Sequence, residues 1–384
     1  MRRTPKENIN QSFINLIRKA HGLIENSDIE KHRHSQDQMG ALFGNSREVA
    51  VTETTVGSMY AEWIRVDRPH SGKKIILYCH GGGYSTGSPL YARTLTTKLA
   101  SQLSMDVFCF DYRLAPEHPY PAAVDDAQTA WDFLMLQGYG AKDIFVAGDS
   151  AGGNLALALG LRLKKQKRML PAGFVLMSPW TDLTVSGKTH VTKADVDPVL
   201  NQNYLNEMIE NYVPQAKKVQ MEAVKPLQAA GTLQEGNTIQ AADTLREANA
   251  LQEGNTIRAA GTLQERNTLQ AANTLQTAGT EKQKPGDKSA NKVFEEIFDT
   301  EYLRNPEISP LFGDFTGFPP TYIQVGDLEV LMSDSTMLQK KMSSEGVAVS
   351  LDTYKNMWHV FQMGPFKTAV EAIHKCGEFI YSVQ

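Results

Sequence analysis

The sequence GDSAGG at residues 148–153 follows a short apolar run, Ile144–Ala147, and opens a stretch rich in leucine and alanine. An apolar run that leads directly into helical sequence predicts a strand, a sharp turn and a helix. The glycines beside Ser150 let the backbone turn where a Cβ atom would clash. A serine on such a turn is exposed at the end of a sheet, so we expect Ser150 to be a nucleophile and more than a structural turn residue. The start of the helix would also offer N–H groups to developing negative charge.

Other short apolar runs occur on both sides of this turn, and stretches with helical spacing separate them. Such alternation predicts a mostly parallel sheet covered by helices on both faces, which is an α/β fold. In such sheets ligands gather at the carboxyl ends of the strands, where the residues considered below fall. The predicted strands are Ile75–Cys79, Val107–Phe110, Ile144–Ala147, Phe174–Met177, Tyr322–Val325 and Val347–Tyr354, and the predicted helices are 92–104, 123–137, 151–166, 334–345 and 366–382.

The sequence HGGGY at residues 80–84 directly follows the first of these runs. Three successive glycines expose backbone N–H groups, and an acyl-transfer site needs such donors for its tetrahedral oxygen. The alternatives are a flexible glycine turn and a phosphate-binding loop. The Gly-Lys-Ser/Thr sequence of a phosphate loop does not follow, which weighs against the second alternative.

A serine nucleophile needs a base, and three histidines follow Ser150 in the chain. Enzymes with this type of turn carry the nucleophile, the acid and the histidine in that order. His374 falls within the last predicted helix, and His190 falls in a polar stretch. His359 lies between the predicted strand Val347–Tyr354 and that helix, hence in a loop at a strand end. We therefore expect His359 to be the base.

The base in turn needs a carboxylate that orients it. The sequence GDLEVL at residues 326–331 follows the strand Tyr322–Val325 and supplies two acids, Asp327 and Glu329. Asp334 is a third, more remote candidate. The residues alone leave this choice open.

Together these motifs resemble those of the hormone-sensitive-lipase-like esterases, a bacterial group also called the α/β-hydrolase fold-3 family. The resemblance spans about residues 50–215 and 293–384. The matching residues are His80–Tyr84, Tyr112–Glu117 with Pro121-Ala122-Ala123, Gly148–Asn154, Ser178-Pro179-Trp180, Ser309-Pro310-Leu311 and His359.

The resemblance implies an α/β-hydrolase fold in which Ser150 is the nucleophile and His359 is the base. It also implies an oxyanion hole formed by the N–H groups of Gly82, Gly83 and Ala151. Many relatives carry their acid as the aspartate of an Asp-Pro-Leu triplet. The matching triplet here is Glu329-Val330-Leu331, so Glu329 takes that place, and a glutamate can also hold the imidazole tautomer.

The same resemblance implies that Tyr112–Glu117 braces the oxyanion loop, which leaves Arg113 and His118 outside the catalytic set. It also implies a helical cap built from residues 1–48 and 183–226, on a hydrolase domain of residues 49–384. Within residues 1–48 the spacing of apolar residues predicts an amphipathic helix over 11–24. The polar residues 25–48 carry His32 and His34, which we interpret as part of a solvated loop and not as a metal site.

A repeat interrupts the hydrolase pattern between residues 227 and 280, where a unit of six residues such as LQEGNT recurs nine times. A helix of period six would turn its leucines around the axis, so a packed helix is not expected. A stacked β-helix is one alternative, but one small apolar residue per unit buries little surface and favours disorder. We expect residues 215–292 to be a low-complexity insertion with a linker in a surface loop, or else an assembly module.

The overall composition excludes several classes of protein. The net charge of −4 and pI near 6.2 argue against a nucleic-acid partner. Three widely spaced cysteines suggest no disulfide framework, and no metal or cofactor site is expected. No apolar run is long enough to span a membrane, so we expect a cytoplasmic protein. A homodimer is a candidate assembly.

These observations predict a serine carboxylesterase that hydrolyses small esters of short acyl chains through an acyl-enzyme intermediate. A lactone or acetyl-group hydrolase with the same residues is an alternative. An alternative of another class is a non-catalytic receptor for a small ligand on the same fold. The joint presence of serine, acid and histidine favours an enzyme.

Overall fold

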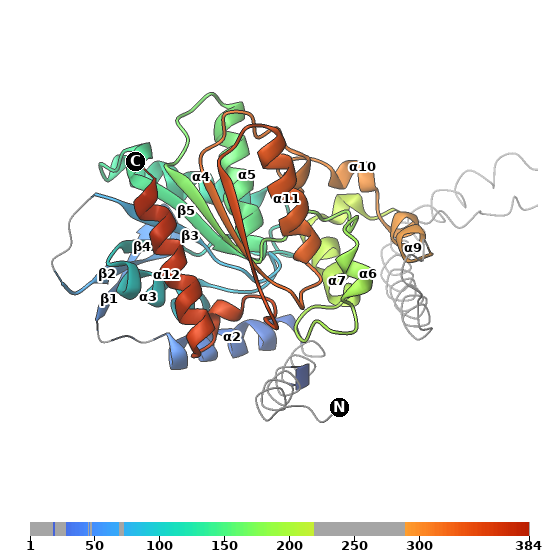
Figure 1. Ribbon diagram of the computed structural model, residues 1–384, viewed down its shortest axis with the longest axis horizontal. Coiled ribbons are helices and arrows are strands. Elements are labelled where there is room, and N and C mark those ends of the chain that lie inside the picture. Colours follow the sequence, from blue (N-terminus) through green and yellow to red (C-terminus); the bar gives the residue numbers. More distant parts are fainter. Residues whose placement is uncertain are drawn as a thin grey trace, which may run out of the picture. The chain divides into compact units, whose positions relative to one another are not determined.

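The computed structural model describes residues 18–19, 28–44, 46, 48–68, 73–218 and 289–383. Within these ranges one sheet runs in the order β1-β2-β4-β3-β5-β6-β7-β8 (Figure 1). The sheet and the residues of the candidate site belong to a unit made of Met1–Lys217 and Phe294–Gln384. The strands are β1 (Val49–Val56), β2 (Met59–Val66), β3 (Ile75–Cys79), β4 (Asp106–Phe110), β5 (Ile144–Asp149), β6 (Gly173–Met177), β7 (Thr321–Gly326) and β8 (Val349–Tyr354).

The strands from β4 to β8 pair in parallel, whereas β1 pairs with β2, and β2 with β4, in antiparallel fashion. The predicted strands begin at Ile75, so the prediction leaves out the first two strands, which form a hairpin. Its turn contains Gly57 with a φ of +62°, a backbone conformation that favours glycine. The prediction of a mostly parallel α/β sheet is confirmed.

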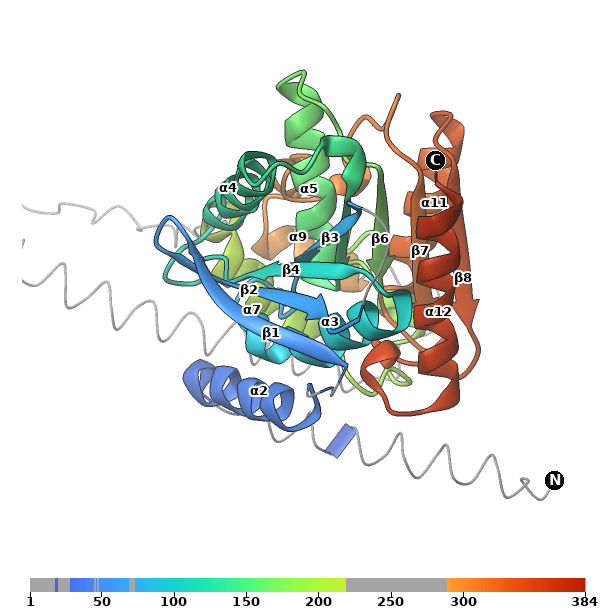
Figure 2. The same ribbon diagram turned by 90° about the vertical axis from the view of Figure 1, so that its left-hand side faces the viewer.

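Helices cover both faces of the sheet (Figure 2). The central strand β5 shows why, because its side chains alternate between two apolar clusters. Ile144 and Val146 belong to the cluster that contains α4, α5 and α11, while Phe145 and Ala147 belong to the one that contains α3 and α12. A strand buried on both sides must be apolar at successive positions, as this one is. The bounds are α3 (Pro89–Leu103), α4 (Ala122–Leu136), α5 (Ala151–Lys165), α11 (Met332–Ser344) and α12 (Lys367–Ser382).

The interpretation of residues 25–48 as a solvated loop is wrong, because most of this segment forms helix α2 (Ile29–Phe43). The Asp28 carboxylate caps its start by accepting the Glu30 N–H. Gly40 lets α2 pack closely on α3, since a Cβ there would lie 2.0 Å from the Leu90 carbonyl oxygen. The helix was not predicted because its sequence is mostly polar, and its buried residues, His32 and Gly40, form no apolar stripe.

Between β6 and β7 the described chain forms several shorter helices. Helix α7 packs a tyrosine, Tyr212, on Tyr84 of the glycine loop, with ring centroids 3.7 Å apart. This contact connects the segment predicted as a cap to the loop predicted as an oxyanion hole. The elements are α6 (Thr189–Thr192), α7 (Gln202–Tyr212), α9 (Ser289–Ile297) and α10 (Thr300–Leu303), with short 3-10 turns at Ala141–Asp143, Pro214–Ala216, Pro310–Phe312 and Phe361–Met363.

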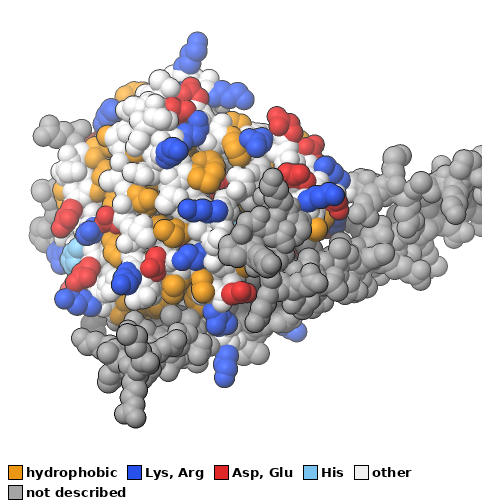
Figure 3. Space-filling model, turned by 45° about the vertical axis from the view of Figure 1, so that its right-hand side comes forward, with side chains coloured by type: hydrophobic (Ala, Val, Ile, Leu, Met, Phe, Trp, Pro, Cys, Tyr) orange, Lys and Arg blue, Asp and Glu red, His pale blue; other side chains and the backbone are white. Residues whose placement is uncertain are grey.

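Some predictions fall outside the described residues. Nearly all of the predicted helix 11–24 does so, and so does the whole repeat 227–280. All three cysteines are described, and they are buried and free. None of the described helices is both long and apolar enough to cross a membrane. On the face that Figure 3 shows, acidic and basic side chains are interspersed.

Candidate active site

Ser150 occupies a strained turn between β5 and α5. Its φ of +53° and ψ of −121° are rare for a residue with a side chain. The turn is possible because Gly148 and Gly152 have no Cβ, which lets their backbones approach each other and β3 closely. A Cβ on Gly152 would lie 2.0 Å from the Cys79 carbonyl oxygen. The two glycines are therefore steric requirements of the turn, as the sequence motif predicts.

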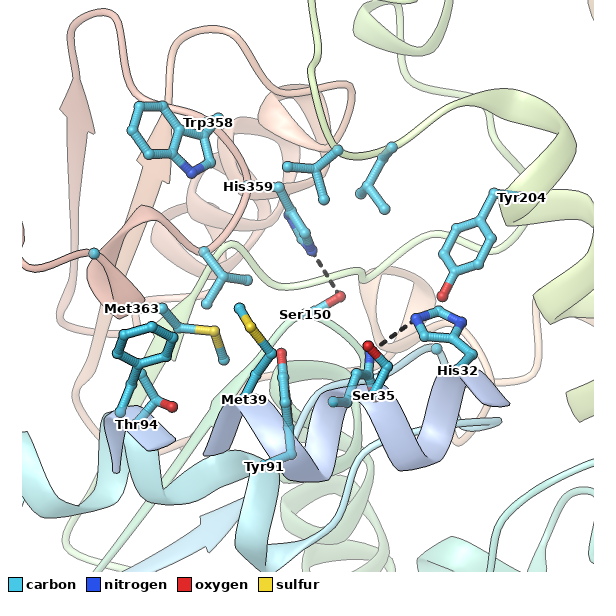
Figure 4. Close-up of a pocket in the computed structure, with 18 of the residues that line it drawn as sticks. His32, Ser35, Met39, Tyr91, Thr94, Ser150, Tyr204, Trp358, His359 and Met363 are labelled. Atoms are coloured by element: carbon cyan, nitrogen blue, oxygen red, sulfur yellow. Dashed lines mark hydrogen bonds between the residues drawn. The ribbon is translucent and has the colours of Figure 1, made fainter. Parts of the chain in front are cut away.

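Ser150, His359 and Glu329 form one continuous chain of hydrogen bonds. The Ser150 Oγ lies 2.9 Å from the His359 Nε2, and the His359 Nδ1 lies 3.0 Å from the Glu329 Oε2. Figure 4 shows the imidazole pointing at the serine across the cavity. Since Nδ1–H donates to the carboxylate, Nε2 carries the lone pair that accepts the serine proton. This is the arrangement that activates a serine hydroxyl.

The Glu329 carboxylate is fully buried and has partners on both oxygens. Its Oε1 accepts from the Ser178 hydroxyl at 2.7 Å and from the Gly326 N–H at 2.5 Å. The rival Asp327 turns away and accepts the Asn356 N–H at 2.6 Å. The third candidate, Asp334, pairs with His190 at 3.1 Å. Of the three acids, Glu329 is the one in contact with His359.

The carboxylates around His359 determine how readily it binds a proton. Burial alone would lower the pKa of the imidazole, because a buried cation loses its hydration. The hydrogen bond and charge of Glu329 outweigh burial, and the charges of Asp197 and Asp149 add to them, so that the pKa of His359 lies above 6.5. These carboxylates therefore favour the protonated form of the imidazole.

The glycine loop after β3 runs beside the serine, and its backbone is one that glycine alone adopts easily. Gly82 has a φ of +116° and Gly83 a φ of +61°, and a Cβ on Gly82 would lie 2.1 Å from the Thr86 carbonyl oxygen. Both glycines line the same cavity as Ser150. Among the described residues, no backbone acceptor is found for the N–H groups of Gly82, Gly83 and Ala151. These groups are available to an oxygen bound beside the serine.

Two buried groups hold the glycine loop against the serine turn. The Asp149 Oδ1 accepts the Gly81 N–H at 3.0 Å and the Tyr78 hydroxyl at 2.6 Å. Burial raises the pKa of Asp149 to about 6, while these hydrogen bonds act in the opposite direction. The Tyr112 hydroxyl donates to the His80 carbonyl at 2.9 Å. Tyr112 thus contacts the loop in the way that the resemblance implies.

Arg113 and His118, which we left outside the catalytic set, do not line the cavity. The Arg113 guanidinium pairs with Asp126 at 2.9 Å. Glu117 pairs instead with Arg33 of α2 at 2.8 Å, and Arg33 also donates to the Ser85 carbonyl at 2.9 Å. This stretch therefore ties α2 to the glycine loop.

A cavity of about 580 Å³ opens above Ser150. Figure 4 shows Met39, Thr94 and Met363 on one side of the serine, with His32 and Tyr204 together on the other. Most of the lining is apolar, as in pockets that bind small organic ligands. Its walls come from α2, α3, the segment 199–205 and the loop 358–365, and the lining residues include Phe43, Tyr91, Trp180, Val199, Leu200, Leu205, Trp358 and Val360.

Comparisons with known proteins agree with this geometry. A profile of the alpha/beta hydrolase fold matches residues 76–246 and 236–363. An esterase of Acinetobacter venetianus is 30% identical over 349 residues, covering 90% of this chain and 87% of that protein. An acetyl-hydrolase of Streptomyces hygroscopicus is 29% identical, with coverage of 88% and 83%. A crystal structure of a hormone-sensitive lipase from a metagenome library has 29% identity and a TM-score of 0.71, covering 98% of this chain and 99% of its own.

The chain belongs to the α/β-hydrolase family of hormone-sensitive-lipase-like esterases. The fold, the family and the class of enzyme predicted from the sequence motifs are confirmed. This member of the family is a carboxylic ester hydrolase. A non-catalytic receptor on the same fold does not agree with these relatives.

Sequence reasoning missed part of the pocket of this esterase. His32, Ser35, Gln36, Met39 and Phe43 follow helical spacing and line the cavity from one face of α2. His32 is buried, its Nε2 lies 3.1 Å from the Gln36 Nε2, and burial lowers its pKa. The spacing was visible in the sequence, but a mixed polar and apolar face gives no clear amphipathic signal. Across the described ranges, no three His, Cys, Asp or Glu side chains form a metal-binding group.

Proposed function

We propose that this esterase hydrolyses small esters of short-chain acids through an acyl-enzyme on Ser150, with His359 as base and Glu329 as its orienting acid. The observation that carries the proposal is the hydrogen-bonded chain of these three side chains at the base of a 580 Å³ cavity. The roles given to the N–H groups of Gly82, Gly83 and Ala151 are part of the same proposal.

In the first half of the reaction, Ser150 Oγ attacks the ester carbonyl carbon while His359 Nε2 takes the serine proton. The carbonyl oxygen becomes an oxyanion, which the three N–H groups and the start of α5 stabilise. The tetrahedral intermediate then collapses. The bond to the alcohol oxygen breaks, that oxygen receives the proton from His359, and the acyl group stays on Ser150.

In the second half, water enters the place of the alcohol. His359 takes a proton from the water, and the resulting hydroxide attacks the acyl carbon. When the second intermediate collapses, Ser150 recovers its proton from His359 and the acid leaves. Glu329 remains ionised throughout, because its role is to hold the Nδ1–H and to stabilise the positive imidazole.

The preference for short acyl chains is supported by one relative, which bears the name acetyl-hydrolase. A series of p-nitrophenyl esters from two to twelve acyl carbons tests it. We expect kcat/KM to be greatest at two to six carbons and to fall at least about tenfold by twelve, because a preference for one acyl length is measured as a ratio of kcat/KM values. Equal kcat/KM values across the series would contradict the short-chain preference. Butyrolactone in the same series tests the lactone alternative.

The acyl-enzyme is tested separately by its kinetics. Rapid mixing with p-nitrophenyl acetate should release a burst of nitrophenol close to one per chain, and acid quenching should leave an acetyl group on the peptide that contains Ser150. The Ser150→Ala variant is the matched control. An absent burst together with an unmodified peptide at full turnover would contradict the covalent route.

The insertion over 215–292 takes no part in the proposed chemistry. The described residues that line the cavity lie before residue 206 or after residue 357, and Ser150, Glu329 and His359 all lie outside the insertion. We therefore propose that replacing residues 219–288 by a short glycine-serine linker leaves esterase activity on small esters intact, because long surface insertions cost little loop entropy. Loss of activity in a folded deletion variant would assign the insertion to the pocket.

A further inference from the structure

A second buried carboxylate, Asp197, lies beside the proposed triad, although no step above uses it. It belongs to the segment between α6 and α7 and is 6% exposed. Its Oδ2 accepts the Val330 N–H at 2.8 Å. Its Oδ1 accepts the N–H groups of Val199 at 2.9 Å and Leu200 at 3.1 Å. A single carboxylate thus connects two chain segments that are far apart in the sequence.

Both connected segments belong to the site. Val330 directly follows Glu329, and its N–H lies in the turn that presents the acid to His359. Val199 and Leu200 line the cavity that would receive the substrate. The Asp197 side chain therefore holds both the pocket wall at Val199 and Leu200 and the turn that carries Glu329. Neither segment can shift without breaking hydrogen bonds to a buried charge.

The charge itself also acts on His359. Burial raises the pKa of Asp197 to about 6, the positive charge of His359 opposes that rise, and the Glu329 carboxylate adds to it. In return, Asp197 favours the protonated form of His359, together with Glu329 and Asp149. The other ionisable side chains that line the cavity are His32, Tyr91, Lys98 and Tyr204. Of these, Lys98 donates to the carbonyls of Gln362, Met363 and Gly364.

We propose that Asp197 is a positioning residue of this esterase, which locks the turn of Glu329 to the pocket wall and stabilises the imidazolium that forms on His359. The inference rests on the proposed roles of Ser150, His359 and Glu329. Asp197 acts through these groups and does not itself touch the reacting atoms.

The Asp197→Asn variant tests this inference because it keeps the size of the side chain and removes its charge. The amide also presents an NH₂ group where the carboxylate accepts N–H donors, so one of the two connections fails. We expect kcat to fall about 10- to 100-fold with a smaller change in KM, and the acid limb of kcat/KM to move at least about half a pH unit lower. The limb moves down because a lost negative charge lowers the pKa of His359.

The Asp197→Ser variant keeps the experiment decisive if the asparagine variant folds poorly. A serine hydroxyl can still accept the Val199 or Leu200 N–H in the local turn but is too short to reach Val330. The same downward shift of the acid limb is expected. The position of that limb does not depend on how much of the enzyme is folded, so partial unfolding cannot imitate it.

Asp182→Asn is the matched control. Asp182 is also buried and lies in the same part of the chain, but its carboxylate accepts the N–H groups of Thr184 and Ser186 within its own segment. It is not among the main charges that act on His359. We expect this variant to lose thermal stability while its acid limb stays within about 0.2 pH units of the wild type.

The outcomes separate this inference from the function on which it rests. An active Ser150→Ala variant overturns the proposed function. An inactive Ser150→Ala variant, combined with unshifted acid limbs and unchanged kcat in both Asp197 variants, overturns only the role of Asp197. An equal shift in the Asp182 control also overturns it, because any buried charge in the segment would then have the same effect.

Discussion

The described part of the chain contains two buried histidine–carboxylate pairs with nearly equal distances, His359 Nδ1 with Glu329 and His190 Nε2 with Asp334. The nitrogen–oxygen distances are 3.0 and 3.1 Å, and in each pair the carboxylate is fully buried. In both, the carboxylate also accepts backbone N–H groups, from Gly326 in one and from Thr181 and Asp182 in the other. From these contacts alone, either carboxylate could orient its histidine as a general base.

They differ in what the second nitrogen of the imidazole faces. The His359 Nε2 meets Ser150 at 2.9 Å in the wall of the cavity. The His190 Nδ1 is buried and has no hydrogen-bond partner among the described residues, and His190 does not line the cavity. The Asp334 pair instead joins α6 and α11 to the chain after β6. We therefore expect a histidine–carboxylate pair to take part in catalysis only where the second ring nitrogen faces a reactive group, and to stabilise the fold elsewhere.

The largest expected effect is the loss of turnover when His359 or its partner Ser150 is replaced. We expect His359→Ala and Ser150→Ala each to lower kcat by about 10⁴- to 10⁶-fold, and the double variant to be little worse than either, because triad members act as a unit. Steady-state hydrolysis of p-nitrophenyl acetate measures this. Ser150→Ala retaining a tenth of wild-type activity would falsify the assignment of the nucleophile.

The next largest effect is expected at the acid beside His359. Glu329→Gln keeps the size of the side chain but removes the charge that holds the imidazole, so we expect kcat to fall about 10²- to 10⁴-fold. Asp327→Asn should change kcat much less, because Asp327 binds the Asn356 N–H and not the histidine. The same assay compares the two variants, and the opposite order would move the role of the acid to Asp327.

A smaller effect is expected in the pH dependence of kcat/KM. The pKa of His359 is raised above 6.5 by Glu329, Asp197 and Asp149. Only the neutral imidazole accepts the serine proton, so kcat/KM should fall as the pH drops through that raised value, with an acid limb above pH 6.5. The His190→Gln variant should keep this limb. A profile that is flat from pH 5 to 9 would argue against a histidine base.

The smallest effect on activity is expected for the second pair. His190→Ala leaves the Asp334 carboxylate buried with one partner fewer, which should lower the free energy of unfolding by about 1–3 kcal/mol. Turnover at 25 °C should stay within about threefold of wild type. Chemical denaturation and kinetics on the same preparation measure both. A large loss of kcat in a stable His190→Ala variant would give this pair a part in the reaction.

Local sequence was sufficient for the elements whose geometry is set by neighbouring residues. The strands β3 to β8 and helices α3, α4, α5, α11 and α12 were predicted with small errors at their ends. The first hairpin was missed, because β1 is exposed at many positions and has no strong apolar run. Helix α2 was missed, because its buried face includes His32 and Gln36. In both cases burial by distant parts of the chain, and not local pattern, decides the structure.

The sequence by itself determined the turn at Ser150 and the exposed backbone N–H groups of the glycine loop. Both depend on the backbone conformation of a few adjacent residues, such as the φ of +53° at Ser150 and the φ of +116° at Gly82. Only the tertiary structure decided what meets the serine. His359 is 209 residues away in the chain, and whether Asp327 or Glu329 contacts it depends on how the turn after β7 bonds to β8 and its loop. The position of Asp197 has the same origin, because a carboxylate that spans two segments exists only once those segments have packed together.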